Sequence, residues 1–446
     1  MTTKVLDKPQ TVDHYGHLFD TQADKLPGAT LPWLAELRAA AMERFAATGF
    51  PTTHDEAYHY TSLAPVERVA FEPAGEQCIG LDTDDLAPYL LAPDGDAHLV
   101  FVNGRLAPSL CRLSSLSAGV RLAGLAQAVE RWPEEVAHHL GHHLSADEPM
   151  AALNTALASD GALLFVEAGA DAGTVELLFL TTASGAPLFS APRNLIAIGA
   201  GGSATVVENH VALGSATAFA DPATEIDLGD TAHLDYVRLA HAPGGFHTGT
   251  VAATQGRDSR LRAHLLGLGG RICRTDFATR LAGEGGEAKV YGLALAADRD
   301  HLDLTTRVDH DAAATRSREQ VKQIVAGRGR GCFSGLVHVH PGAQQTDARL
   351  ANANLLLSDR AEADTRPQLL IYADDVKCSH GATVGRLDDD ALFYLRSRGI
   401  DGAEARQMLT SAFAAEITDT LANPILRRTA AERMGARLET LLAEAG

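Results

Sequence analysis

Hydrophobic and polar positions change their spacing twice along this chain. Between residues 161 and 385, short runs of Val, Leu, Ile, Phe and Thr recur, and Gly, Asp, Asn and His separate them. Examples of these runs are VELLFLTT, ATVVENHVAL, FHTGTVAAT and HLDLTTRVDH. Such runs predict β-strands, and only residues 317–327, with the sequence SREQVKQIVAG, have a spacing that fits a helix.

The predicted strands favour a coil over other β-folds. A long series of short strands is typical of β-sandwiches, propellers and parallel β-solenoids. Two-residue hairpin turns are rare between residues 161 and 385, which disfavours meanders and propellers. Gly and Asp between the runs suit the corners of a coil whose rungs stack about 4.8 Å apart. The pattern therefore predicts a parallel β-solenoid with Val, Ile and Leu inside and Thr, Asp and His outside.

Helical patterns precede the predicted strands. Apolar positions three or four residues apart predict helices over residues 33–48, 122–143 and 148–159. Residues 1–30 show no clear period, and residues 97–107 read as a hairpin around an Asn103-Gly104 turn. We therefore treat residues 1–160 as an N-terminal helical and mixed region.

Helical spacing returns after the strands. The helices predicted there span residues 388–398, 402–421 and 424–445. The middle helix has an apolar side, which is typical either of core packing or of a docking face for a partner. That side consists of Met408, Leu409, Phe413, Ile417 and Leu421. The chain thus divides into the N-terminal region, a β-solenoid core over residues 161–385 and a C-terminal helical domain over residues 386–446.

Composition and charge narrow the class of protein. The chain has 446 residues, 46% hydrophobic and 21% charged, as in an ordinary globular protein. Its formal net charge of −19 argues against nucleic-acid binding, which needs clustered basic residues. No apolar run approaches the roughly 20 residues of a membrane span. The first residues lack the apolar core of a secretory signal, so we expect a cytoplasmic protein without a membrane partner.

The cysteines exclude several kinds of site. The five cysteines are scattered, at positions 78, 111, 273, 332 and 378, and no CxxC occurs. This argues against a zinc ribbon, a thioredoxin-like pair, a disulfide framework and a ferredoxin-type cluster held by four close thiolates. Cys378 and His380 stand two residues apart in a predicted strand, so their side chains leave the same face and could share one metal ion. A buried cysteine with an unrelated histidine explains the same spacing.

The spacing of the other histidines points less clearly to a metal or ligand site. His138 and His142, and likewise His139 and His143, would share a helix face, but no HExxH motif is present and a polar helix end explains them. His338 and His340 would share one strand face and could reach a common ligand, although outward polar positions of a rung explain them too.

An enzyme remains an alternative interpretation. Carbohydrate-active β-helix enzymes place paired carboxylates on one open face of the coil. Asp303, Asp309, His310 and Asp311 could be assembled in that way, which would make the chain an intracellular lyase or hydrolase. The absence of an export signal weighs against it, because most polysaccharides are extracellular.

Several sequence blocks between residues 150 and 425 resemble one known family. The blocks are RNLIAIG (193–199), ATVVENH (204–210), TQGRDS (254–259), GEGGEAKVYG (283–292), DDVKCSHGATVG (374–385) and ALFYLRSRGI (391–400). Together and in order, they resemble the SufB/SufD family of iron–sulfur cluster assembly scaffold proteins. The resemblance implies a mainly β fold, with a right-handed parallel β-helix core between the N-terminal region and the C-terminal helical domain.

The resemblance also implies partners and a site. Residues 374–385 lack the cysteine context and the following acidic ligand expected of SufB, which places the resemblance on the SufD side of the family. It implies a non-catalytic scaffold subunit of the SUF system, whose Cys378 and His380 hold transient iron or an Fe–S cluster shared with a SufB-like paralogue. It further implies that the C-terminal helical domain docks a SufC-like ABC ATPase. Whether the isolated chain forms a homodimer, and whether a flavin takes part, stays open.

The charge next to Cys378 leads to one further hypothesis. The ammonium of Lys377 could favour the thiolate of Cys378 if the two groups lie close. Strand alternation, however, points neighbouring side chains to opposite faces.

Overall fold

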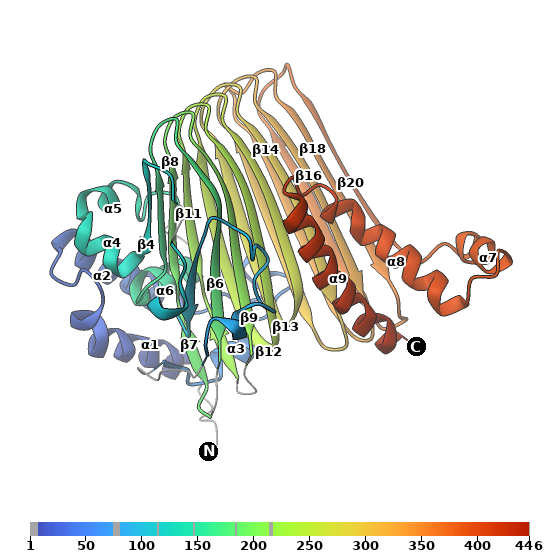
Figure 1. Ribbon diagram of the computed structural model, residues 1–446, viewed down its shortest axis with the longest axis horizontal. Helices are drawn as coiled ribbons and strands as arrows, with labels where there is room; N and C mark the ends of the chain where they lie inside the picture. The colour runs from blue at the N-terminus through green and yellow to red at the C-terminus, as the bar shows by residue number, and fades with distance from the viewer. Residues whose placement is uncertain are drawn as a thin grey trace.

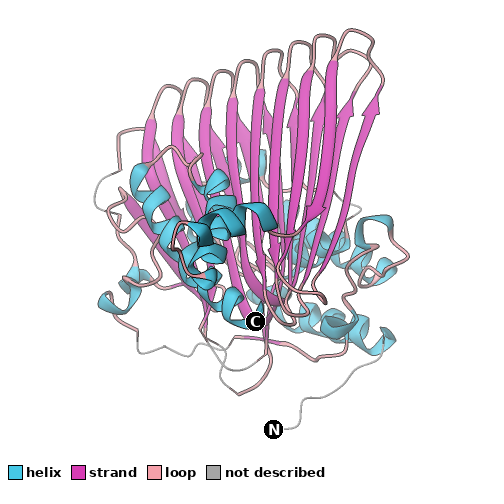
Figure 2. Ribbon diagram, turned by 90° about the vertical axis from the view of Figure 1, so that its right-hand side faces the viewer, coloured by secondary structure: helices cyan, strands magenta, loops and turns pink. Residues whose placement is uncertain are grey.

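The computed structural model describes residues 8–74, 81–113, 116–145, 148–182, 185–213 and 217–445. In this part of the chain, one 20-stranded sheet winds into a solenoid, with helices at its N-terminal end and along its side (Figure 1). In a view turned by 90° about the vertical axis, the long strands stand next to one another along the coil (Figure 2). The prediction of a mainly β protein with a β-solenoid core and helical flanks is confirmed.

The long strands stack into two parallel series, which we call face A and face B. Face A contains β5 (Ala162–Val166), β8 (Arg193–Ile198), β11 (Ala223–Leu228), the second halves of β12 (His233–Gln255) and β13 (Arg260–Leu281), β15 (His301–His310), β17 (Arg330–Val339) and β19 (Glu362–Ile371). Face B contains β2 (Ala97–Val102), β6 (Asp171–Thr181), β9 (Ser203–Ala212), the first halves of β12 and β13, β14 (Glu287–Ala296), β16 (Arg316–Val325), β18 (Asp347–Leu356) and β20 (Lys377–Gly385).

Short strands complete the sheet at the N-terminal end. A third side is formed by β1 (Glu72–Pro73), β7 (Leu188–Ser190) and β10 (Ala218–Ala220), which pair in parallel with one another and with β12. β3 (Arg105–Leu106) forms the predicted hairpin with β2, and β4 (Val120–Gly124) pairs antiparallel with β5. Asn103 and Gly104 both have positive φ at the hairpin turn, as a type I′ turn requires.

Alternation along each strand fills the interior. Side chains that face inward stack on the equivalent position of the next coil, and a continuous apolar core results. One such file consists of Leu234, Leu261, Ala288, Ser317, Ala348 and Cys378, each paired with the next. Corners join the sides of the coil. Their backbone conformation repeats from coil to coil, although their residue types differ.

One corner has positive φ in six successive coils. The residues there are Gly201, Thr231, Asp258, Gly285, Ala314 and Gln345, with φ between 55° and 74°. Each of them donates its backbone N–H to a carbonyl of the following coil, and the last bond runs from Gln345 to Asp375 at 2.6 Å. This ladder satisfies corner amides that would otherwise lack a partner. It also explains why no sequence repeat is visible, because backbone geometry rather than a fixed residue type makes the corner.

Residues 317–325 lie in a strand and 326–327 in the turn that follows, so the helix suggested by their spacing is wrong. The strand is β16, where Glu319, Val321, Gln323 and Val325 face inward. Glu319 and Gln323 are polar although they occupy interior positions. The alternation of apolar and polar residues that is typical of a strand is therefore not visible in this segment. Pairing with β14 and β18 on both sides overrides the weak local preference for helix.

Helices cover the N-terminal end of the solenoid. They are α1 (Lys8–Gln22), α2 (Pro32–Thr48), α3 (Ala64–Glu67), α4 (Leu125–Arg131), α5 (Pro133–His139) and α6 (Pro149–Leu157), with short 3-10 turns at Ala23–Lys25, Glu56–Tyr58, Asp84–Leu86 and Pro108–Leu110. The predicted helix over residues 33–48 is confirmed, and that over 148–159 is slightly shorter. Residues 8–22 are helical although their sequence has no clear period. They are held by buried Tyr15 and Leu18, which pack among α2, α6 and the aromatic side chains of the third side.

The helix predicted over residues 122–143 is only partly right. Its first residues belong to β4, and Pro133 divides the remainder into α4 and α5. Proline suits the first turn of a helix and interrupts a helix interior, which explains the division.

The C-terminal helices are α7 (Asp389–Ser397), α8 (Gly402–Thr418) and α9 (Pro424–Ala445), close to the predicted ranges. α8 and α9 lie along the outside of face B, whereas α7 projects away from the body (Figure 1). The buried side of α9 consists of Leu426, Ala430, Met434, Leu438 and Leu441. Among the described residues, no helix is long and apolar enough to cross a membrane.

Candidate functional site

The solenoid ends in a rung that nothing in the described chain covers. β19 pairs with β17 and β20 pairs with β18, and within the described residues no strand pairs with their other edges. β20 is the last strand at the end of the solenoid toward α7 (Figure 1). An edge of this kind presents a row of free backbone donors and acceptors to another chain. We call β19 and β20 the terminal rung.

Cys378 and His380 occupy interior positions of the terminal rung. In the strand pairing, Cys378 follows Ala348 and His380 follows Leu350, and both residues of β18 are buried in the core. The two side chains therefore leave the same face of β20, at positions where the next coil would cover them. Cys378 is half-buried against the core, and His380 is exposed.

Large apolar side chains are exposed on and beside the terminal rung. Leu370, Ile371, Tyr372 and Val384 of the terminal rung and the turn after β19 are 40–60% exposed. A concentration of large exposed apolar side chains on an unpaired sheet edge is typical of an interaction site. Sequence reasoning did not identify this edge, because it depends on where the last coil ends and not on any single residue.

The surroundings of Cys378 favour the neutral form of its thiol. Burial raises the pKa of the Cys378 thiol above its usual value. A hydrogen bond with the backbone of Ala348 lowers this pKa, and the negative charge of Asp347 raises it further. The hypothesis that Lys377 stabilises the thiolate is wrong, because alternation points Lys377 away from the interior and it does not contribute to this shift. A bound metal ion would supply the missing positive charge, since a coordinating thiol is deprotonated by its metal.

Polar side chains line the interior directly behind the terminal rung. Glu319 lies two coils behind His380, with Leu350 between them. Gln323 and Asn354 occupy an adjacent file that ends at Val384. Burial raises the pKa of the Glu319 carboxyl to about 7. Polar side chains therefore occupy the interior near its open end, as they also do farther along the coil, where Glu208, His210 and Arg238 are buried.

Glu319 makes the stability of the fold depend on pH. Its carboxyl has a pKa of about 7 in the folded chain and about 4.5 unfolded, so the penalty for its charge appears as pH rises between these values. We expect Glu319→Gln to raise the free energy of unfolding at pH 8 by roughly 2–3 kcal/mol relative to wild type, and by far less near pH 4.5.

Denaturant unfolding of both chains at the two pH values measures this difference. The exposed Glu439→Gln change is the control and should leave the pH dependence of stability unaltered. An equal effect of Glu319→Gln at both pH values would contradict a raised carboxyl pKa.

The other described cysteines are not part of the terminal rung. Cys273 and Cys332 are buried, and burial raises the pKa of the Cys273 thiol to about 12 and that of the Cys332 thiol well above its usual value. Cys111 lies on the N-terminal hairpin segment, with its Sγ 3.3 Å from the Ala107 carbonyl oxygen. Cys78 lies outside the described residues.

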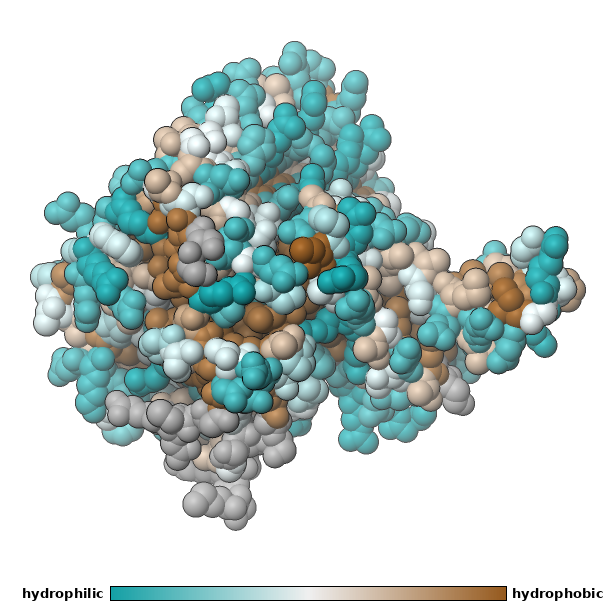
Figure 3. Space-filling model, viewed as in Figure 1, coloured by the Kyte–Doolittle hydropathy of each residue, from teal (hydrophilic) through white to brown (hydrophobic). Residues whose placement is uncertain are grey.

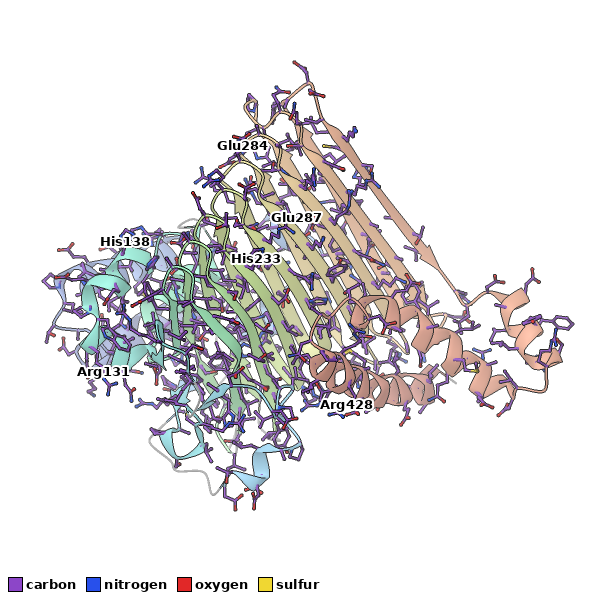
Figure 4. All side chains as sticks on the ribbon, turned by 45° about the horizontal axis from the view of Figure 1, so that its top comes forward. Arg131, His138, His233, Glu284, Glu287 and Arg428 are labelled. Atoms are coloured by element: carbon purple, nitrogen blue, oxygen red, sulfur yellow. The ribbon has the colours of Figure 1, made fainter. Side chains whose placement is uncertain are left out.

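The histidines around α5 are structural neighbours of face A. His139 Nδ1 lies 2.9 Å from Asp227 Oδ2, and His143 Nδ1 lies 2.9 Å from Thr254 Oγ1. Figure 4 places His138 on α5, at the end of the solenoid opposite the terminal rung. These contacts attach α5 to the outside of the coil, in agreement with a polar helix end.

The carboxylates of the enzyme alternative do not share one open face. His310 is buried in the interior, where its ring contacts Thr315 and Ser317. Asp303 is buried under the N-terminal region and contacts Arg274 and Thr61. Of these four residues only Asp309 and Asp311 lie together on the outer face, so the set of four that the sequence suggested is not assembled on one open face.

The C-terminal helices expose two aromatic side chains. Phe393 and Tyr394 of α7 are 73% and 57% exposed, and the projecting helix carries hydrophobic surface (Figure 3). The apolar side of α8 is divided: Ile417 and Leu421 are buried against face B, whereas Met408 is exposed. Core packing therefore accounts for the C-terminal part of that side, and its N-terminal part continues the exposed surface of α7.

Comparison with known proteins relates the whole chain to one family. Residues 179–413 match the SufBD core domain of the SUF system for FeS cluster assembly, and residues 9–174 match the SufBD N-terminal region. The chain is 32% identical to the iron–sulfur cluster assembly protein SufD of Escherichia coli over 96% of both chains. It is 31% identical to a SufBD family protein of Synechocystis over 87% of both chains, and 27% identical to SufD of Bacillus subtilis over 62% of this chain and 63% of that protein. This chain therefore belongs to the SufBD family of the SUF iron–sulfur cluster assembly system.

Proposed function

We propose that this chain is a non-catalytic scaffold subunit that builds a nascent Fe–S cluster at an interface with a SufB-like paralogue. Cys378 and His380 are the residues that it contributes. The observation that carries this proposal is their position on the terminal rung, at the open end of two interior files. A subunit that covers this edge would complete the shell of ligands around the cluster.

The chemistry of the two side chains suits a transient site. A thiolate and an imidazole bind iron more strongly than oxygen ligands do. Stable Fe–S clusters, by contrast, are held by four protein ligands, usually cysteines. One thiolate and one imidazole leave positions that a second subunit must fill. Such a site can capture iron and then release an assembled cluster, and its ligands belong to the cargo rather than to a resident cofactor.

The C-terminal helical domain is the proposed docking site for a SufC-like ABC ATPase. α9 is held against face B by its buried side, so it serves as a support. The exposed surface lies on α7 and the start of α8, where Phe393, Tyr394 and Met408 are accessible. A groove of about 290 Å³ lies beside this surface, between the end of β20 and α8, and includes Val384, Leu409 and Phe413 in its lining. An ATPase docked on α7 would in this way lie close to the terminal rung, so that its conformational change would reach the rung over a short path.

Anaerobic co-expression with a SufB-like and a SufC-like partner tests the proposed function. We expect the three chains to co-purify, and the complex to contain iron and acid-labile sulfide that the isolated chain lacks. A homodimer of the isolated chain that paired through the terminal rung would compete with the SufB-like partner for the same edge and should give way to the complex. Purification of this chain without either partner, from cells in which both partners are folded, would refute the proposal. Release of unsaturated sugars by the chain alone would instead support the enzyme alternative.

A further inference from the structure

Two histidines and two aspartates gather on the outside of face A, where β15 and β17 end. His338 lies opposite Asp309 in the strand pairing, and His340 follows two residues later. Both imidazoles therefore leave the outer face beside Asp309. Their ring centroids are 3.9 Å apart. Asp311 follows β15 and also faces outward, toward His340.

The ligand atoms have the spacing that a metal ion needs. Asp309 Oδ1 lies 3.0 Å from His338 Nδ1 and 3.7 Å from His340 Nε2. One ligand atom from each of these three residues lies within 4.8 Å of the others. With bonds of 2.0–2.1 Å in a tetrahedral site, neighbouring ligand atoms are about 3.3 Å apart. Asp311 Oδ1 lies 3.2 Å from His340 Nε2, so it can act as a fourth ligand or orient that ring.

The charges around these residues predict a cation-binding site of moderate affinity. Arg307 donates to both oxygens of Asp309, at 2.6 and 2.8 Å, and so fixes the orientation of the carboxylate. The same guanidinium competes with a metal ion for Oδ1. We therefore expect weaker binding than in a closed structural zinc site.

We propose that Asp309, His338 and His340 form a binding site for a divalent transition-metal ion. Imidazole ligands favour ions from Fe²⁺ to Zn²⁺ over Mg²⁺ and Ca²⁺, which prefer oxygen ligands. This site is separate from Cys378 and His380, because those residues face the interior from face B. It nevertheless lies next to the terminal rung, since the ring of His338 contacts that of Tyr372, directly after β19, at a centroid distance of 5.6 Å.

Metal titration of the tag-free chain tests the site. Carrying Cys378→Ala in every protein keeps that thiol from contributing, so the result does not depend on the proposed function. We expect Co²⁺ to give visible absorption bands at one ion per chain, and Zn²⁺ to displace it. His338→Ala or His340→Ala should weaken binding at least about tenfold, because even the loss of an outer partner of a metal site costs 10–100-fold.

The controls separate loss of ligands from loss of fold. Removal of the exposed His17 of α1, by His17→Ala, should leave the affinity unchanged. Asp309→Asn preserves the shape of the side chain and should also weaken metal binding. This variant therefore tests the site even if the histidine variants do not fold. Absence of any bound Co²⁺ at one ion per chain, or equal binding by wild type and the Asp309→Asn and histidine variants, would overturn the proposal.

Discussion

Cys378→Ala is expected to abolish the accumulation of Fe–S cluster on the complex of this chain with its partners. The change removes the only thiol that the terminal rung offers at its interior face among the described residues. His380 alone cannot replace it, since a single imidazole binds iron far less strongly than a thiolate–imidazole pair. His380→Ala should reduce the cluster in the same way, because it removes the other member of the pair.

The expected loss is one of chemistry and not of folding. Cys378 is only half-buried, so its replacement by alanine should change the free energy of unfolding by less than about 1 kcal/mol. Iron and acid-labile sulfide are measured on the anaerobic complex, together with the amount of each subunit. The control is Cys111→Ala, which removes a half-buried thiol far from the terminal rung and should leave the cluster intact. Full cluster on the Cys378→Ala complex would remove Cys378 from the site.

Phe393→Asp is expected to release the ATPase while the contact with the paralogue persists. Phe393 has the largest exposed fraction, 73%, of the described large hydrophobic side chains, and it lies on a helix that projects from the body. Aromatic anchors of this kind often carry 2 kcal/mol or more of binding free energy. A loss of that size weakens binding about 30-fold.

Calorimetric titration of the ATPase into the wild-type and variant chains measures this loss. Leu113→Asp is a matched control, because Leu113 is also an exposed apolar residue but lies in the N-terminal region. It should bind the ATPase as wild type does. Unchanged ATPase affinity in Phe393→Asp would place the docking surface elsewhere.

The sequence contained enough information for the fold class and for most helix positions. Short β-runs without hairpin turns predicted the coil, and apolar spacing predicted α2, α6 and the C-terminal helices. The sequence did not reveal the coil repeat, because the positive-φ corner is occupied by Gly, Thr, Asp, Ala and Gln in turn. A backbone hydrogen-bond ladder holds these residues in place, and such a ladder leaves no fixed residue pattern.

The candidate site could be predicted only in part. The spacing of Cys378 and His380 placed both on one face of a strand, as the structure has them. Neither the open edge of the terminal rung nor the raised carboxyl pKa of Glu319 could be inferred, since both depend on which coil lies next. The relation of His338 to Asp309 likewise comes from the pairing of β15 with β17, which joins residues far apart in sequence.

The central claim is that another subunit covers the terminal rung. Hydrogen–deuterium exchange of the amides in residues 377–385 tests it most directly, because amides that face an unpaired edge exchange quickly in the isolated chain. We predict that binding of the SufB-like partner slows exchange in β20 and β19 and leaves β8 and β11 unaffected. Unchanged exchange in the terminal rung of a fully formed complex would contradict the claim.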